Sequence, residues 1–221
     1  MTHLGFQFQG QDFVARASGA LFWPGEQALI VADLHLGKSE RMARRGGALL
    51  PPFETRATLE RLAIDLEETR AAHLIALGDA FDDDIAACSL GCEISALCAR
   101  VHVTWIAGNH DPGAADLPGQ QAAELHRQGI TLRHIAGESC DISGHYHPKI
   151  RIAGQRLPVF LIGAQHLILP AYGLYTGGLD WQDRVLQALV PEGRAIATGP
   201  RALMLPLPPP AQASARRGRW R

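Results

Sequence analysis

The chain has 221 residues, of which 47% are hydrophobic and 19% charged, and its formal net charge at pH 7 is −1. These values are ordinary for a soluble globular protein and exclude a strong overall positive potential that would attract nucleic acid. No N-terminal stretch resembles a secretion signal, and no apolar run is long enough to cross a membrane. We therefore expect a cytoplasmic protein with a single domain over residues 1–205 and a disordered, Pro- and Arg-rich tail over residues 206–221.

The first predicted elements are short strands between residues 6 and 32, where apolar and polar side chains alternate. Ala28–Ala32 is a continuous apolar run, which is typical of a strand covered on both faces, and Asp33-Leu34-His35 follows it. The next segment, residues 36–47, is basic. It predicts either a contact with a nucleic-acid backbone or a solvated helix face.

Two helix–strand units come next. Residues 53–70 predict a helix, and His73–Leu77 predicts a buried strand that ends at Gly78-Asp79. Residues 85–100 predict a second helix, in which three of the four cysteines lie without CxxC spacing, so we expect buried thiols rather than a zinc site. An alternating apolar strand over residues 101–106 then leads to Gly108-Asn109-His110-Asp111.

The second half of the chain repeats this arrangement of strands followed by polar residues. Residues 122–128 predict a short helix that Gly129 ends, and Ile130–His134 predicts a strand that ends in a histidine. Gly144-His145-Tyr146-His147 follows a further short strand. Later apolar segments predict strands at residues 157–162, 167–169 and 203–205, with a pairing segment within 194–202.

Every polar motif in this series lies where a predicted strand ends, and in layered α/β folds ligands bind where strands deliver their carboxyl ends. The candidate donors are two aspartates, one asparagine and four histidines, namely Asp33, His35, Asp79, Asn109, His134, His145 and His147. Imidazole, carboxylate and amide together suit first-row transition metals, and seven donors are too many for one ion. Two ions that share one carboxylate and one water would catalyse the hydrolysis of a phosphoester.

The motifs DLH, GD, GNHD and GHYH, in this order, resemble those of the calcineurin-like metallophosphoesterase family. The resemblance implies an α/β fold, a four-layer αββα sandwich of two mixed β-sheets flanked by helices. It also implies two divalent metal ions bridged by Asp79. One ion would be held by Asp33, His35, Asp79 and His147, and the other by Asp79, Asn109, His134 and His145. His110 would protonate the leaving oxygen or bind the phosphate, and Asp111 would orient His110.

DLHLGKSE, GHYHP and the stretch over residues 169–178 are similar to the small DNA-ligase-associated members of this family, described as DNA-damage-response endonucleases. The resemblance implies a phosphodiesterase that acts on DNA in repair, by attack of a hydroxide that bridges the metals. It also implies a functional link to a DNA ligase and a helicase. Manganese is the first choice of metal, and iron or zinc remain open because the ligand set does not separate them.

Several alternatives remain open from the residues alone. His126 competes with His134 as the fourth histidine ligand, but it lies in a predicted helix, so the strand-end histidine is favoured. The substrate could instead be a phosphomonoester or a small nucleotide, and a catalytically silent scaffold is the remaining reading. For Asp82-Asp83-Asp84 we expect a solvated loop or a helix cap. Tyr172 and Tyr175 are candidates for core packing or for stacking on a base.

Overall fold

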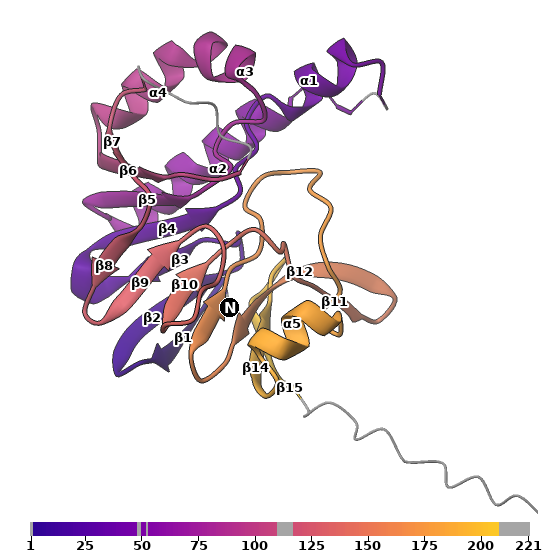
Figure 1. The fold of residues 1–221 in the computed structure, drawn as a ribbon. Helices are drawn as coiled ribbons and strands as arrows, with labels where there is room; N and C mark the ends of the chain where they lie inside the picture. The colour runs from indigo at the N-terminus through magenta and orange to yellow at the C-terminus, as the bar shows by residue number, and fades with distance from the viewer. Residues whose placement is uncertain (1, 48–49, 52, 110–116, 208–221) are drawn as a thin grey trace, which may run out of the picture.

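The structure is a computed structural model that describes residues 2–47, 50–51, 53–109 and 117–207. Two mixed β-sheets pack face to face, with most of the helices on the outer face of the first sheet (Figure 1). The helices are α1 (Lys38–Arg44), α2 (Glu54–Thr69), α3 (Asp84–Ser89), α4 (Gly91–Cys98) and α5 (Arg184–Leu189).

The first sheet has seven strands in the order in which they occur in the chain. They are β1 (His3–Phe8), β2 (Gln11–Arg16), β3 (Leu21–Trp23), β4 (Ala28–Ala32), β5 (His73–Leu77), β6 (His102–Ile106) and β7 (Gln120–Ala122). β1 to β4 pair antiparallel, whereas β4 to β7 pair parallel. The carboxyl ends of β4, β5 and β6 therefore lie at one edge of the sheet.

The second sheet has eight strands, in the order β15-β14-β12-β13-β10-β9-β8 with β11 paired to β12. They are β8 (Leu125–Arg127), β9 (Ile130–Arg133), β10 (Asp141–Ser143), β11 (Lys149–Ile152), β12 (Gln155–Ile162), β13 (His166–Ile168), β14 (Gly193–Ala197) and β15 (Leu203–Leu207). β9, β10 and β13 run parallel, so their carboxyl ends also share an edge.

Three apolar clusters hold the layers together. The central cluster lies between the sheets and includes Phe13, Ile30 and Phe160. A second cluster, with Leu62 and Phe81, joins the first sheet to its helices, and a third, with Leu186, joins the second sheet to α5. Helix, sheet, sheet and helix follow one another, so the predicted four-layer sandwich is confirmed, with α5 as the outermost layer on the second sheet.

The helix predicted at residues 122–128 is wrong. β8 and β9 form a hairpin in which Arg127 pairs with Ile130. The two residues of its turn, Gln128 and Gly129, have φ angles of 50° and 78°. Positive φ at both positions is the geometry of a tight type I′ turn, whose twist matches that of the paired strands. Gly129 thus closes a hairpin rather than ending a helix.

Three other expectations need correction. The helix predicted over residues 85–100 is two helices, α3 and α4, which meet at Leu90. Its cysteines are not buried, because Ala86, Ala87 and Ile94 supply the buried face instead. Pro206 and Leu207, the first two residues of the predicted tail, pair instead with β14, and residues 208–221 lie outside the described part of the chain. Within the described residues, the helices are too short or too polar to span a membrane.

Candidate metal centre

Side chains from both sheets meet at the carboxyl ends of their parallel strands. Asp33 and His35 follow β4, Asp79 follows β5, and Asn109 lies three residues beyond β6. From the second sheet, His134 follows β9 directly, and His145 and His147 follow β10. The ligand atoms fall into two groups that could each hold a metal ion, Asp33 with His35 and His147, and Asp79 with His134 and His145.

The two groups are adjacent. His147 Nε2 lies 3.3 Å from Asp33 Oδ1, and His134 Nε2 lies 3.5 Å from Asp79 Oδ2. His134 also connects the groups, because its Nδ1 atom is 3.7 Å from Asp33 Oδ1. Asn109 Oδ1 lies 2.9 Å from His134 Nε2, which brings the amide to the second group.

The backbone at this site adopts an unfavourable conformation. Five of the six clustered residues, all except His134, have positive φ angles, namely Asp33 (53°), His35 (45°), Asp79 (47°), His145 (69°) and His147 (46°). Left-handed φ angles are uncommon outside glycine and cost free energy, so they persist only where the surrounding structure enforces them. Here they turn the chain sharply after each strand and direct successive polar side chains toward the same place.

Two motif glycines make room for the donors. The space where a Cβ atom of Gly78 would lie is filled by the ring of His134, and a Cβ atom on Gly144 would lie 2.5 Å from Asp33 Oδ2. Glycine is therefore required at both positions by the close approach of a donor from the other sheet. This packing against Gly78 also distinguishes His134 from His126, the other candidate for the fourth histidine ligand.

His126 lies on β8 rather than on a helix, and its ring is 3.1 Å from the hydroxyl of Thr131 and beside Glu124. It belongs to neither donor group. His134 is buried, and its Nδ1 atom lies 3.0 Å from the carbonyl oxygen of Leu77. The structure therefore brings His134, and not His126, to the donor groups.

The electrostatics of the cluster fit bound cations. Asp33 Oδ1 and His147 Nε2 are buried and lie 3.3 Å apart, but neither makes a hydrogen bond of acceptable geometry within the described residues. Burial opposes protonation of His134, but Asp79 and Asp33 raise its pKa, whereas burial and the neighbouring charge of His134 lower the pKa of His145. The cluster thus combines buried carboxylates with two imidazoles whose pKa values shift in opposite directions. Divalent ions that accept nitrogen and oxygen ligands would neutralise the charge of these carboxylates.

Asp82 is a functional candidate that sequence reasoning assigned to a solvated loop or a cap. It is buried, its Oδ1 atom lies 3.0 Å from His35 Nδ1, and its other oxygen forms an ion pair with Arg41 of α1. Metal-binding histidines commonly donate their second ring N–H to a carboxylate in this way. The position of Asp82, three residues after Asp79, is the feature of the sequence that could have indicated a role at the site. Asp83, by contrast, caps α3 by accepting from the Ala86 amide, as predicted for this segment.

The basic segment and the tyrosines are also placed. Arg41 and Arg44 of α1 pair with Asp82 and Asp83, so two of the three basic side chains in this helix contact acidic residues of the protein itself. Tyr172 is buried in the core, and Tyr175 is half-exposed. A groove of about 340 Å³ runs beside the donors and is lined by His145, Tyr146, His147, Gly178 and Leu179.

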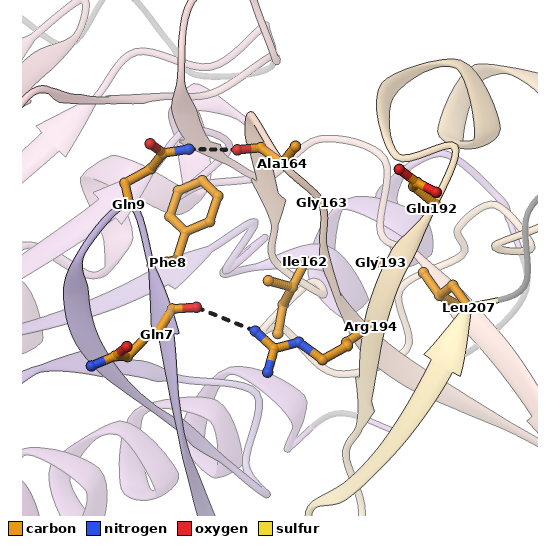
Figure 2. A pocket seen from close by; sticks show the side chains of 10 residues that line it. All are labelled: Gln7, Phe8, Gln9, Ile162, Gly163, Ala164, Glu192, Gly193, Arg194 and Leu207. Carbon is orange, nitrogen blue, oxygen red and sulfur yellow. Dashed lines mark hydrogen bonds between the residues drawn. The ribbon is translucent and has the colours of Figure 1, made fainter.

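A larger pocket, of about 530 Å³, lies between the β1–β2 turn and the β12–β14 region of the second sheet. Figure 2 shows that polar groups in its wall bond to one another, with Arg194 Nη2 donating to the carbonyl of Gln7 and the Gln9 amide donating to that of Ala164. None of the predicted donors lines it. The volume of a pocket alone therefore does not identify the functional site, whereas the carboxylates and imidazoles place it at the strand ends.

Two mixed sheets with paired carboxylate and imidazole clusters at their strand ends define a metal-dependent phosphoester hydrolase. Residues 27–188 match the family model of the calcineurin-like phosphoesterases, and the chain belongs to this family. The predictions of the family and of the enzyme class are therefore confirmed. His110 and Asp111, the predicted catalytic residues, lie outside the described residues.

A solved nuclease structure agrees with this assignment. The crystal structure of Pseudomonas putida nuclease MPE is 29% identical to the chain and has a TM-score of 0.72, and the match covers 93% of this chain and 100% of that one. Yfce, a phosphoesterase from E. coli, is 16% identical with a TM-score of 0.38, over 69% of this chain and 83% of that one. A comparison with curated proteins finds no match.

Proposed function

We propose that the protein is a phosphodiesterase that uses two divalent metal ions to hydrolyse nucleic acid. Mn²⁺ is the first choice of metal, and DNA is the proposed substrate. The observation that carries the proposal is the pair of donor groups at one edge of the sandwich. They lie side by side, because His134 of one group is 3.7 Å from Asp33 of the other. Two adjacent ions are the arrangement that phosphodiester hydrolysis uses.

Each donor has a proposed role. Asp33, His35 and His147 would bind one ion and His134, His145 and Asn109 the other, with the Asp79 carboxylate shared between them. When bound, the ions would activate water for attack on phosphorus and neutralise charge on the phosphoryl oxygens. His110 would donate a proton to the leaving oxygen, with Asp111 orienting it, as the family resemblance implies. His35 would be held in one orientation by Asp82.

Nucleic acid is favoured as substrate by two features. The similar Pseudomonas putida protein is a nuclease. The groove of about 340 Å³ lined by His145 and His147 leaves space beside the donors for a substrate phosphate. The likeness to the DNA-ligase-associated phosphoesterases supports a cytoplasmic role in DNA repair, linked to a ligase and a helicase.

The first test compares hydrolysis of bis-p-nitrophenyl phosphate with that of p-nitrophenyl phosphate after chelation and Mn²⁺ add-back. We expect Mn²⁺-dependent turnover of the diester, abolished in Asp79→Asn and reduced at least a hundredfold in His110→Ala. Asp84→Asn, which changes an exposed carboxylate nearby, should retain full activity. Turnover of the monoester alone would replace the proposal with a phosphatase.

The second test uses single-stranded and duplex DNA, in linear and circular form, under the same conditions. Cleavage of circular DNA would demonstrate endonuclease action, and release of mononucleotides from linear DNA alone would demonstrate exonuclease action. Diester turnover without cleavage of any nucleic acid would overturn the assignment of the substrate while leaving the metal chemistry in place.

A further inference from the structure

Asp33 is held by its backbone at a left-handed φ of 53°. Its N–H donates to the carbonyl of Gly78, at 3.2 Å, and its own carbonyl accepts from the N–H of Gly173, at 3.0 Å. The preceding carbonyl, of Ala32, accepts from the N–H of Tyr172 at 2.7 Å. Because a left-handed aspartate needs external constraint, the segment that carries Tyr172 and Gly173 is part of what keeps Asp33 in place.

That segment is itself anchored by the side chain of Tyr172. The ring is 1% exposed, and its hydroxyl donates to Asp65 Oδ2 of α2 at 2.8 Å. The guanidinium of Arg61 lies 4.2 Å from the ring centroid and also bonds to the Tyr172 carbonyl. The segment between β13 and α5 thus reaches from the second sheet to the helices that cover the first (Figure 1).

The anchor is completed by a buried ion pair. Asp65 is 2% exposed, and its Oδ1 atom lies 2.5 Å from the Nε atom of Arg16 on β2. Both carboxylate oxygens therefore have a donor, one charged and one neutral. Burial and the charge of Asp65 raise the pKa of Tyr172, so its hydroxyl stays protonated and remains a donor. Removing that hydroxyl would leave a buried carboxylate oxygen without its partner, which is costly.

We propose that Tyr172 and Asp65 form a positioning pair that holds Asp33 in its metal-binding conformation. Among the described residues, the interactions found for the two side chains are with each other, with Arg16 and with Arg61. The pair therefore acts on Asp33 through the backbone hydrogen bonds from Tyr172 and Gly173 to Ala32 and Asp33. This inference rests on the proposed function, because it requires that Asp33 bind a metal ion. It predicts that metal affinity at the group of Asp33, His35 and His147 depends on the hydroxyl of Tyr172, which bonds to Asp65 of α2.

The experiment measures Mn²⁺ binding by calorimetry on metal-free wild type and on Tyr172→Phe, Asp65→Asn and the double variant. The expected result is a loss of about tenfold in the affinity of one of two ions in each single variant. The losses should add only in part in the double variant, because both changes act on the same hydrogen bond, whereas Asp65→Asn also removes the charge that pairs with Arg16. Saturating Mn²⁺ should restore diester turnover in Tyr172→Phe.

Thr104→Val is the matched control. Thr104 is buried in the middle of β6, and its hydroxyl lies 2.8 Å from the Nε2 atom of His73, the first residue of β5. It should lower thermal stability about as much as Tyr172→Phe, with Mn²⁺ affinity unchanged. Equal Mn²⁺ affinity in Tyr172→Phe and wild type would overturn the positioning role while leaving the proposed function intact. Absence of Mn²⁺ binding in wild type would instead refute both.

Discussion

His35 Nδ1 lies 3.0 Å from Asp82 Oδ1, across 47 positions of sequence, and the same carboxylate pairs with Arg41 of the basic helix α1. A histidine held in this way presents its other ring nitrogen in one orientation, which favours metal binding. Asp82 is therefore a residue whose importance depends on its contact with a donor rather than on binding metal itself.

Replacing Asp82 by asparagine should weaken Mn²⁺ binding and lower diester turnover by roughly tenfold or more, because the ring of His35 loses its charged acceptor. Burial opposes the charged form of Asp82, but His35 and Arg41 lower its pKa, so the carboxylate stays ionised at neutral pH. Calorimetry with Mn²⁺ measures the effect, and Asp84→Asn serves as the exposed control. Full affinity in Asp82→Asn would show that Arg41 and Asp82 serve stability alone.

Gly144→Ala should abolish Mn²⁺-dependent turnover. Its Cβ atom would lie 2.5 Å from Asp33 Oδ2 and closer than contact distance to Ala32, so the carboxylate or the strand end must move. Gly91→Ala is the control, because a Cβ atom there meets nothing within 4 Å and lies in α4, where alanine is favoured. Normal activity in Gly144→Ala would mean that Asp33 can shift without loss of metal.

His134→Ala and His126→Ala separate the two histidines directly. We expect His134→Ala to lose at least a hundredfold in activity and one bound ion, because its ring lies between Asn109, Asp79 and His145. His126→Ala should retain both ions, since its ring contacts only Thr131 and Glu124 among the interactions found for it. Metal content after dialysis, measured by mass spectrometry, decides between them, and the reverse pattern would exchange their roles.

The way in which the unfolding free energy of the metal-free protein changes with pH should depend on His73. Burial, together with the charges of His102 and Arg127, lowers the pKa of His73 to about 4, with Glu26 acting in the opposite sense. Between pH 6.5 and 4 the unfolded chain binds a proton at this histidine that the folded chain does not. Its contribution to stability is therefore full above pH 6.5 and is lost as the pH falls toward 4.

His73→Asn should reduce this acid-side loss of unfolding free energy by about 1 kcal/mol, less than the full pKa shift implies because the ring is only half-buried. Urea unfolding at pH 4.5 and pH 7.5 measures the difference between variant and wild type. Since the metal-binding histidines are the same in both, they cancel in the comparison. Identical pH dependence in the two proteins would contradict the assignment.

Local patterns in the sequence were sufficient for most of the strands and for the candidate donors. The apolar run of β4, the boundaries of α2 and the polar residues after each strand depend on periodicity and on the chemistry of neighbouring positions. The β8–β9 hairpin was misjudged because Leu125 and its polar neighbours suit a short helix as well as a strand. Only the left-handed turn at Gln128 and Gly129 resolves the choice.

From the sequence alone, short motifs and the alternation along each strand indicated a set of strand-end donors, and the resemblance of these motifs to those of the calcineurin-like metallophosphoesterases implied the enzyme family and the four-layer fold. The tertiary structure decided which donors lie together, the exclusion of His126, and the burial of Asp82 against His35. It also decided the bond between Tyr172 and Asp65, which are 107 positions apart. Such contacts depend on how the two sheets and the helices pack, and no pattern within a few neighbouring residues encodes that packing.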